Sequence, residues 1–215
     1  GYKFQRVDLE GAPIIDADCD RVVGTQRGTT LEQNGARVRT TEHVLAALYG
    51  SRVDNALLQI TGPEIPIMDG SSLLFVNAIE KVGFEDQDAE RIYLELDENI
   101  AWEDVDKGIE FLAVPDINYR ITVMVDYKSP VLGTQHATMY NVGEFVSEIS
   151  RCRTFVFLRE LEFLAKNNLI KGGDLDNAIV LVEKADVNKE ELSRLAKLLG
   201  KEDLDISVEG IGVLN

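Results

Sequence analysis

The order in which strand patterns and helix patterns follow one another most constrains the fold of this chain. In the first half, residues alternate over 2–7, and two β-rich stretches flank Asn34-Gly35, a dipeptide that tolerates positive φ at both turn positions. Apolar residues then recur at helical spacing from Val44 to Tyr49. We therefore predict these elements: a strand at 2–7, a hairpin over 22–40, a helix from 42 that Gly50 ends in the left-handed conformation, a strand at 55–60 and a helix over 71–82 that buries Leu74, Ala78, Ile79 and Val82.

The second half shows the same order after an acidic linker at 84–90. Its predicted elements are strands at 92–96, 101–105, 109–114 and 120–127, helices at 145–151 and 158–167, a strand at 178–182 and a helix at 189–199. A unit with strands first and helices later folds as a sheet that helices cover on one face. The sequence therefore predicts an α+β protein with two domains, at 1–86 and 87–215.

The charge balance excludes some partners. Lys and Arg total 22 against 38 for Asp and Glu, so the net charge of −16 disfavours nucleic acid and anionic membranes. Apolar runs are far shorter than the ~20 residues of a membrane-spanning helix, so we expect a soluble, cytoplasmic protein without a transmembrane segment. Cys19 and Cys152 are far apart and form no Cys-x-x-Cys motif, and we expect two free, buried thiols.

Glu42 and His43 stand at the start of the first predicted helix, where Thr40 or Thr41 can cap the first turn. Neighbouring helical side chains point about 100° apart, so the pair can flank one ligand, with one residue binding a metal while the other moves a proton. Taken alone, a Glu-His pair more often belongs to a capped helix whose histidine contacts a neighbouring carbonyl group. A metal motif needs several ligands at defined spacing.

Five strings in the chain resemble one family and occur in its order: Thr41 to Leu48 (TEHVLAAL), Asp54-Asn55, Gly62 to Ser71 (GPEIPIMDGS), Arg153-Thr154-Phe155 and Leu169 to Asp174 (LIKGGD). The sequence is similar to the zinc-dependent UDP-3-O-acyl-N-acetylglucosamine deacetylases of lipid A biosynthesis, along nearly its whole length. The resemblance implies two similar α+β domains that face each other, with the active site between them. It also implies hydrolysis of the 2-acetamido group of UDP-3-O-(3-hydroxyacyl)-N-acetylglucosamine by water that zinc activates.

The resemblance also implies roles for individual residues. His43 would be a zinc ligand, and Glu42 the general base that takes a proton from the activated water. The hydroxyl of Thr154 would hydrogen-bond the oxyanion of the tetrahedral intermediate. Phe155 would contact substrate, and Lys171 belongs to an inserted element that forms a passage for the acyl chain, so we place both among the substrate-binding residues. On sequence alone, Thr154 reads as a plain strand residue and Phe155 as a core aromatic.

The loop from Gly62 to Ser71 is the longest match, yet its residue types favour a structural role. Pro63 and Pro66 restrict its backbone, Gly70 suits an unusual backbone conformation, and Asp69 can cap the helix that begins near Ser71. We therefore leave this loop out of the candidate site.

The family completes its metal site with His-x-x-x-Asp on a later helix, a motif that does not occur before Asn215. We expect the chain to be a fragment that lacks the first strand and the last ligands, and to be inactive alone. Two alternatives stay open: a catalytically incomplete relative that serves as a binding or scaffold module, and a relative that keeps the fold without zinc. The strings around His136 and Lys171 most resemble the branch fused to a hydroxyacyl-carrier-protein dehydratase, so we expect such a domain in the full-length chain.

Overall fold

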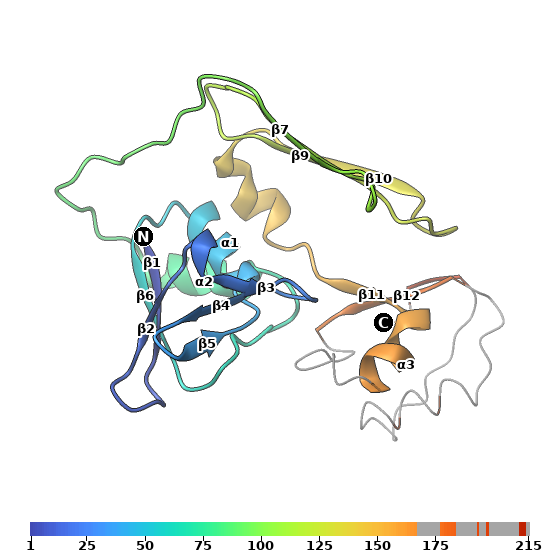
Figure 1. Ribbon diagram of the computed structural model, residues 1–215, viewed down its shortest axis with the longest axis horizontal. Coiled ribbons are helices and arrows are strands. Elements are labelled where there is room, and N and C mark those ends of the chain that lie inside the picture. Colours follow the sequence, from blue (N-terminus) through green and yellow to red (C-terminus); the bar gives the residue numbers. More distant parts are fainter. Residues whose placement is uncertain (167–176, 184–192, 194–196, 198–210, 214–215) are drawn as a thin grey trace.

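The structure is a computed structural model that describes residues 1–166, 177–183, 193, 197 and 211–213 (Figure 1). Its first part contains two three-stranded sheets, with strand orders β2-β1-β6 and β3-β4-β5. The strands are β1 (Tyr2–Arg6), β2 (Ile14–Asp16), β3 (Val22–Gly24), β4 (Thr30–Gln33), β5 (Ala36–Val38) and β6 (Ala56–Ile60), and a short 3₁₀ turn, η1 (Cys19–Arg21), precedes β3. β1 pairs antiparallel with β2 and parallel with β6.

The hairpin predicted around Asn34-Gly35 is confirmed. β4 and β5 pair antiparallel on either side of this turn. The φ angles of Asn34 and Gly35 are 53° and 73°, which is the left-handed backbone that the dipeptide tolerates. The predicted strands at 2–7 and 55–60 are confirmed as β1 and β6.

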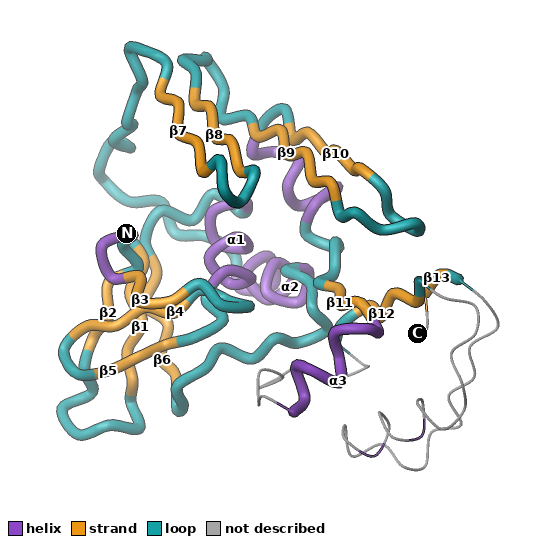
Figure 2. The backbone as a smooth tube through the Cα atoms, turned by 45° about the vertical axis from the view of Figure 1, so that its right-hand side comes forward, coloured by secondary structure: helices purple, strands orange, loops and turns teal. Residues whose placement is uncertain are grey.

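Two helices complete this part, α1 (Glu42–Gly50) and α2 (Leu73–Val82). They lie against each other in the middle of the molecule (Figure 2). One face of α1 covers the sheets, where the buried core consists of Phe4, Ile15, Leu31, Ala36, Val38, Val44, Leu48 and Ile65. Burying this much apolar side-chain surface is the main force that holds α1, and with it Glu42 and His43, on the sheets.

The predicted buried face of α2 is wrong in part. Val76 is fully buried and Ile79 partly so, but Leu74, Ala78 and Val82 are exposed, Val82 to 87%. The buried face is set by the partners of α2, because Val76 packs with Ala47 of α1 and with Phe145.

Phe145 belongs to a segment predicted as a helix over 145–151. The structure has a 3₁₀ turn, η2 (Val142–Glu144), followed by a π-helical turn, η3 (Phe145–Ile149). The ring of Phe145 occupies the space where a Cβ on Gly50 would lie. Gly50 therefore permits close contact between α1 and η3 and does not end α1 in the left-handed conformation, as the sequence predicted; Arg52, two residues later, has a φ of 60°.

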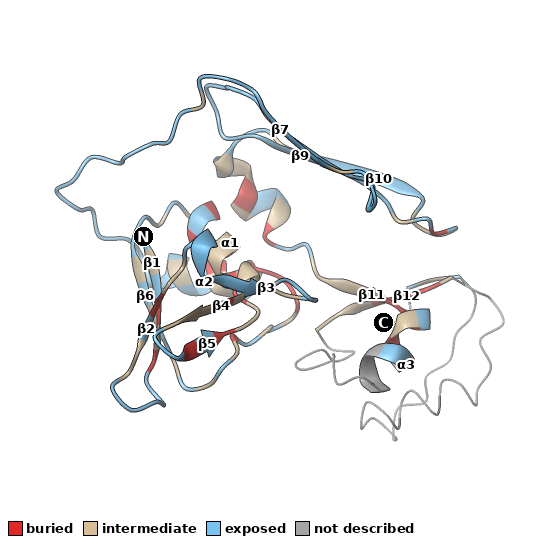
Figure 3. Ribbon diagram, in the orientation of Figure 1, coloured by how far each residue is buried: buried red, intermediate tan, exposed pale blue. Residues whose placement is uncertain are grey.

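Two hairpins follow, in which β7 (Ile100–Asp104) pairs with β8 (Ile109–Ala113) and β9 (Ile121–Asp126) with β10 (Thr134–Met139). Almost all residues of these four strands are exposed (Figure 3). The sequence predicted one sheet here with helices covering one of its faces. Among the described residues, β7 to β10 form two separate two-stranded sheets instead, and the expected helical cover is not seen. The strand predicted at 92–96 is wrong: this segment is an exposed stretch, and within the described ranges it pairs with no strand.

The last described elements are α3 (Leu158–Lys166) and a sheet of order β11-β12-β13. Its strands are β11 (Phe155–Phe157), β12 (Ile179–Val182) and β13 (Gly212–Val213). α3 packs on β11 and β12, and these elements confirm the predictions at 158–167 and 178–182. The helix predicted at 189–199 lies outside the described residues.

The mixture of helices and small sheets confirms the α+β class, whereas the division at residue 86 into two similar domains stays a prediction. In the described part of the chain, no helix is long and apolar enough to cross a membrane. The expected burial of the cysteines is wrong. Cys19 and Cys152 are free, as predicted, but both are exposed.

Candidate active site at the start of α1

The segment that leads into α1 is held by hydrogen bonds from its own threonines. Thr40 has a φ of 56°, and its Oγ1 donates to Glu64 Oε1 at 2.7 Å. Thr41 is fully buried, and its Oγ1 donates to the carbonyl oxygen of Thr29 at 3.3 Å. Thr41 is the N-cap residue of α1, as predicted, but α1 has no side-chain cap hydrogen bond. The hydroxyls of Thr40 and Thr41 each bind a neighbouring loop instead.

Glu42 is the first residue of α1 and is half-buried. Its Oε2 accepts a hydrogen bond from the backbone N–H of Thr29 at 2.9 Å. A carboxylate at the positive end of a helix is favourably placed, and the bond to Thr29 limits the orientations it can take. Glu42 thus has one oxygen bound to the backbone and the second near Gly28.

His43 is also half-buried, and its main chain is tied to α2, since Ser72 Oγ donates to the His43 carbonyl oxygen at 3.0 Å. Its neighbour Glu42 can accept a proton, and its own imidazole can bind a divalent metal. A zinc site needs three or four ligands. The described residues form no group of three metal-binding side chains at His43, so this part of the chain supplies one candidate ligand and does not complete a zinc site.

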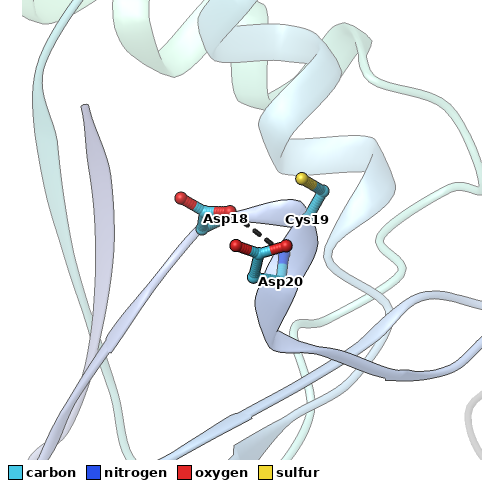
Figure 4. A group of neighbouring side chains, drawn as sticks. All are labelled: Asp18, Cys19 and Asp20. Atoms are coloured by element: carbon cyan, nitrogen blue, oxygen red, sulfur yellow. Dashed lines mark hydrogen bonds between the residues drawn. The ribbon is translucent and has the colours of Figure 1, made fainter.

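One group of three metal-binding side chains does occur in the described part of the chain, at Asp18, Cys19 and Asp20 (Figure 4). All three are exposed, and their ligand atoms lie within 4.8 Å of one another. The Asp18 carboxylate accepts the backbone N–H of Asp20 at 3.0 Å, which lowers the pKa of Asp18 from its ordinary value. This contact is the N-cap of η1, so the cluster is explained by the local turn.

Thr154 is half-buried and directly precedes β11. Its backbone N–H donates to the Gly70 carbonyl oxygen at 2.8 Å, and its Cγ2 lies 3.2 Å from where a Cβ on Gly70 would be. Gly70 has a φ of 84°, and its added Cβ would collide with the carbonyl oxygen of Asn177. The unusual conformation predicted for Gly70 is confirmed, and only glycine fits this position without displacing Asn177.

The loop before α2 joins the two candidate parts of the site. At one end Ser72 holds the main chain of His43, and at the other Gly70 holds the main chain of Thr154. Arg153 Nε adds a hydrogen bond to the Asp69 carbonyl oxygen at 2.7 Å. The structure therefore links Glu42 and His43 to Thr154 through Ser72 and the end of the loop 62–71, for which the sequence favoured a structural role only.

Asp69 stabilises the same loop. Its Oδ1 accepts hydrogen bonds from Ser71, from the backbone N–H at 3.1 Å and from Oγ at 2.7 Å. Burial raises the pKa of Asp69, but the hydrogen bonds from Ser71 outweigh it, so this pKa lies below its ordinary value. Asp69 thus organises the turn before α2, while Ser72 is the N-cap residue of that helix.

Phe155 lies in an aromatic cluster with its ring edges against Tyr127 and Phe157, at centroid distances of 5.4 and 5.6 Å. Edge-to-face contacts of this kind are typical of cores. Phe155 is nonetheless half-buried, so part of its surface stays accessible. Lys171, the other predicted substrate-binding residue, lies outside the described residues.

Comparison with known proteins decides the family. A family-wide sequence profile, described as LpxC: UDP-3-O-acyl N-acetylglycosamine deacetylase, matches residues 1–197. The chain belongs to this family.

Two kinds of relatives are similar to this deacetylase-family chain. The bifunctional enzymes LpxC/FabZ of Bacteroides thetaiotaomicron and Chlorobaculum tepidum are each 44% identical to it, over all of this chain and 46% of their own length. The UDP-3-O-acyl-N-acetylglucosamine deacetylase of Idiomarina loihiensis is 40% identical over 196 residues, which cover 89% of this chain and 63% of the relative. The chain thus spans about half the length of the bifunctional relatives that it matches.

Three residues of this deacetylase-family chain touch the candidate site without having been predicted from the sequence: Gly28, Thr29 and Ser72. Their contacts with Glu42 and His43 join positions 13 to 29 residues apart, and residue type alone does not predict such pairings. One signal was available for Gly28, because an isolated glycine in a strand pattern often marks close approach by another group.

Proposed function

We propose that the full-length protein hydrolyses the 2-acetamido group of UDP-3-O-(3-hydroxyacyl)-N-acetylglucosamine in lipid A biosynthesis, giving acetate and a free amine. Family membership supports a hydrolase, and the names of the related deacetylases support a UDP-3-O-acyl-N-acetylglucosamine substrate. The observation that carries the proposal is the half-buried Glu42 carboxylate, fixed beside His43 at the first turn of α1.

We assign zinc as the cofactor, with His43 as one of its ligands. Because the described residues offer no complete set, the other ligands would come from parts of the protein outside them. When bound, zinc supplies two things that amide hydrolysis needs at neutral pH, a lowered pKa for water and a polarised carbonyl.

In this proposal, one residue of the chain transfers the proton and another stabilises the negative charge that develops on the substrate. Glu42 takes a proton from water as the water oxygen attacks the amide carbonyl carbon, and it returns the proton to the amine nitrogen when the C–N bond breaks. The Thr154 hydroxyl donates a hydrogen bond to the carbonyl oxygen, which gains negative charge in the tetrahedral intermediate. Phe155 and Lys171 contact the acylated sugar nucleotide.

Two substitutions in the full-length protein test these roles. Glu42→Ala should lower kcat by about 10²–10⁴-fold, with zinc content unchanged. His43→Ala should lose bound zinc, measured by elemental analysis after gel filtration, and activity with it. Full activity in Glu42→Ala would remove Glu42 as the base.

The same experiment separates the enzyme from a non-catalytic relative. A binding or scaffold module would show no turnover in the full-length wild type, yet would still bind the nucleotide sugar in calorimetry. We expect no turnover from the isolated segment 1–215, because His43 is the one zinc ligand that we assign among its described residues and a zinc site needs three or four.

Two further assignments concern the whole protein. We propose that it also carries a hydroxyacyl-carrier-protein dehydratase domain, which is supported by the bifunctional relatives. Dehydration of a hydroxyacyl carrier protein by the full-length protein, and its loss on truncation after residue 215, would test this assignment. We also propose a cytoplasmic location, for which recovery in the soluble fraction after cell lysis is the direct test.

A further inference from the structure

The Glu42 carboxylate is bound on one side by a tight turn between β3 and β4. We infer that this turn, Arg27-Gly28-Thr29, is a positioning element for Glu42: the Thr29 amide fixes Oε2, and the missing side chain at Gly28 leaves space beside Oε1. This role rests on the proposed function of Glu42 as the base. The turn would act through Glu42 and would not touch the substrate itself.

The first observation is the hydrogen bond itself. Thr29 N donates to Glu42 Oε2 at 2.9 Å, within the normal range for a backbone donor. A carboxylate held by one oxygen cannot turn freely about its last torsion, so the second oxygen keeps a defined direction. Holding a reacting group in its productive orientation removes part of the entropy barrier to reaction.

The second observation is that a side chain at position 28 would make a tight contact with Glu42. A Cβ at this position would lie 3.3 Å from Glu42 Oε1 and 3.6 Å from Thr40 Oγ1. The φ of Gly28 is 154°, a conformation that residues with a side chain rarely adopt. A methyl group at position 28 would therefore lie against Oε1, the oxygen that is left for the proton of the attacking water.

The third observation is that the turn has contacts of its own on both sides. The Thr29 carbonyl oxygen accepts from the backbone N–H of Thr41 at 3.4 Å and from Thr41 Oγ1 at 3.3 Å. On the other side, Arg27 forms an ion pair with Glu160 of α3 at 2.9 Å. The donor to Glu42 thus belongs to a turn with contacts to both α1 and α3.

A pair of glycine substitutions in the full-length, zinc-loaded protein tests this role. Gly28→Ala should lower kcat about 10- to 100-fold, the range expected when a reacting group is misplaced, while KM and zinc content change less than twofold. Gly35→Ala is the matched control, because Gly35 also has positive φ but has nothing within 4 Å of an added Cβ. Gly35→Ala should keep the wild-type kcat.

A second measurement does not depend on activity or on folding of Gly28→Ala. Hydrogen exchange of the Thr29 amide should be protected in the wild type and in Glu42→Gln, which retains an acceptor oxygen, and should speed up at least tenfold in Glu42→Ala. Equal exchange of this amide in all three proteins would overturn the positioning role.

The outcomes separate the positioning role from the proposed function. If Glu42→Ala abolishes turnover but folded Gly28→Ala keeps the wild-type kcat, Glu42 is the base and the turn does not position it. If Glu42→Ala itself keeps full activity, the assignment of the base fails, and the positioning role fails with it.

Discussion

The substitution Gly50→Ala should have two opposing effects on the free energy of unfolding, both at the contact between α1 and η3. Alanine is a better helix former than glycine by about 1 kcal/mol in a helix interior, and this gain is smaller at position 50, the last residue of α1. Against it, the new methyl group would overlap three ring atoms of Phe145, a residue that is 8% exposed. Overpacking of a core costs about 1–3 kcal/mol, so we expect a net loss of about 1–2 kcal/mol in the free energy of unfolding.

A double-mutant cycle isolates the cause of this loss. Urea unfolding followed by circular dichroism gives the free energy for wild type, Gly50→Ala, Phe145→Ala and the double variant, and amide exchange in α1 reports on the helix itself. In the Phe145→Ala background the overlap is gone, so Gly50→Ala should become neutral or stabilising. An equal loss in both backgrounds, or no loss in the wild type, would refute this account of Gly50.

Other predictions concern the loop before α2 and the thiols. Gly70→Ala should destabilise by more than about 2 kcal/mol, because overpacking adds to the strain of its positive φ; an unchanged melting temperature would contradict this. Asp69 has a lowered pKa, so its contribution is complete above the unfolded pKa near ~3.9 and falls as the pH drops through the folded value. The difference in stability between wild type and Asp69→Asn, measured by urea unfolding, should therefore be complete at pH 6 and should shrink only as the pH falls below the unfolded pKa and through the lower folded pKa of Asp69. Cys19 and Cys152 should both react with a thiol reagent in the native protein, and protection of either would contradict its exposure.

Residue types predicted where the helices and strands lie better than which of their residues are buried. The Asn34-Gly35 turn and the start of a helix at Glu42 follow from residue types within a few positions. The buried face of α2 was predicted wrongly at Val82, because it depends on contacts with α1 and Phe145. The segment at 92–96 has the residues of a strand, but a strand also needs a neighbour with which to form hydrogen bonds.

The residues of the candidate site were predicted better than the contacts that position them. Glu42, His43 and Thr154 were found through their resemblance to a family, and the structure places them on segments joined by the loop before α2. The contacts that position them come from Thr29, Gly70 and Ser72. Each of these contacts joins positions far apart in the sequence and involves at least one backbone atom, so residue types near Glu42, His43 or Thr154 do not predict them.

The parallel pairing of β1 with β6 has a kinetic consequence. Tyr2 is paired with Ala56, and Arg6 with Ile60, so more than fifty residues, including all of α1, lie within the loop that this pairing closes. The chain loses the conformational entropy of closing so long a loop before the hydrogen bonds between β1 and β6 can stabilise the pairing. We expect the pairing of β1 with β6 to form late in refolding, after contacts between elements that are closer together in the chain.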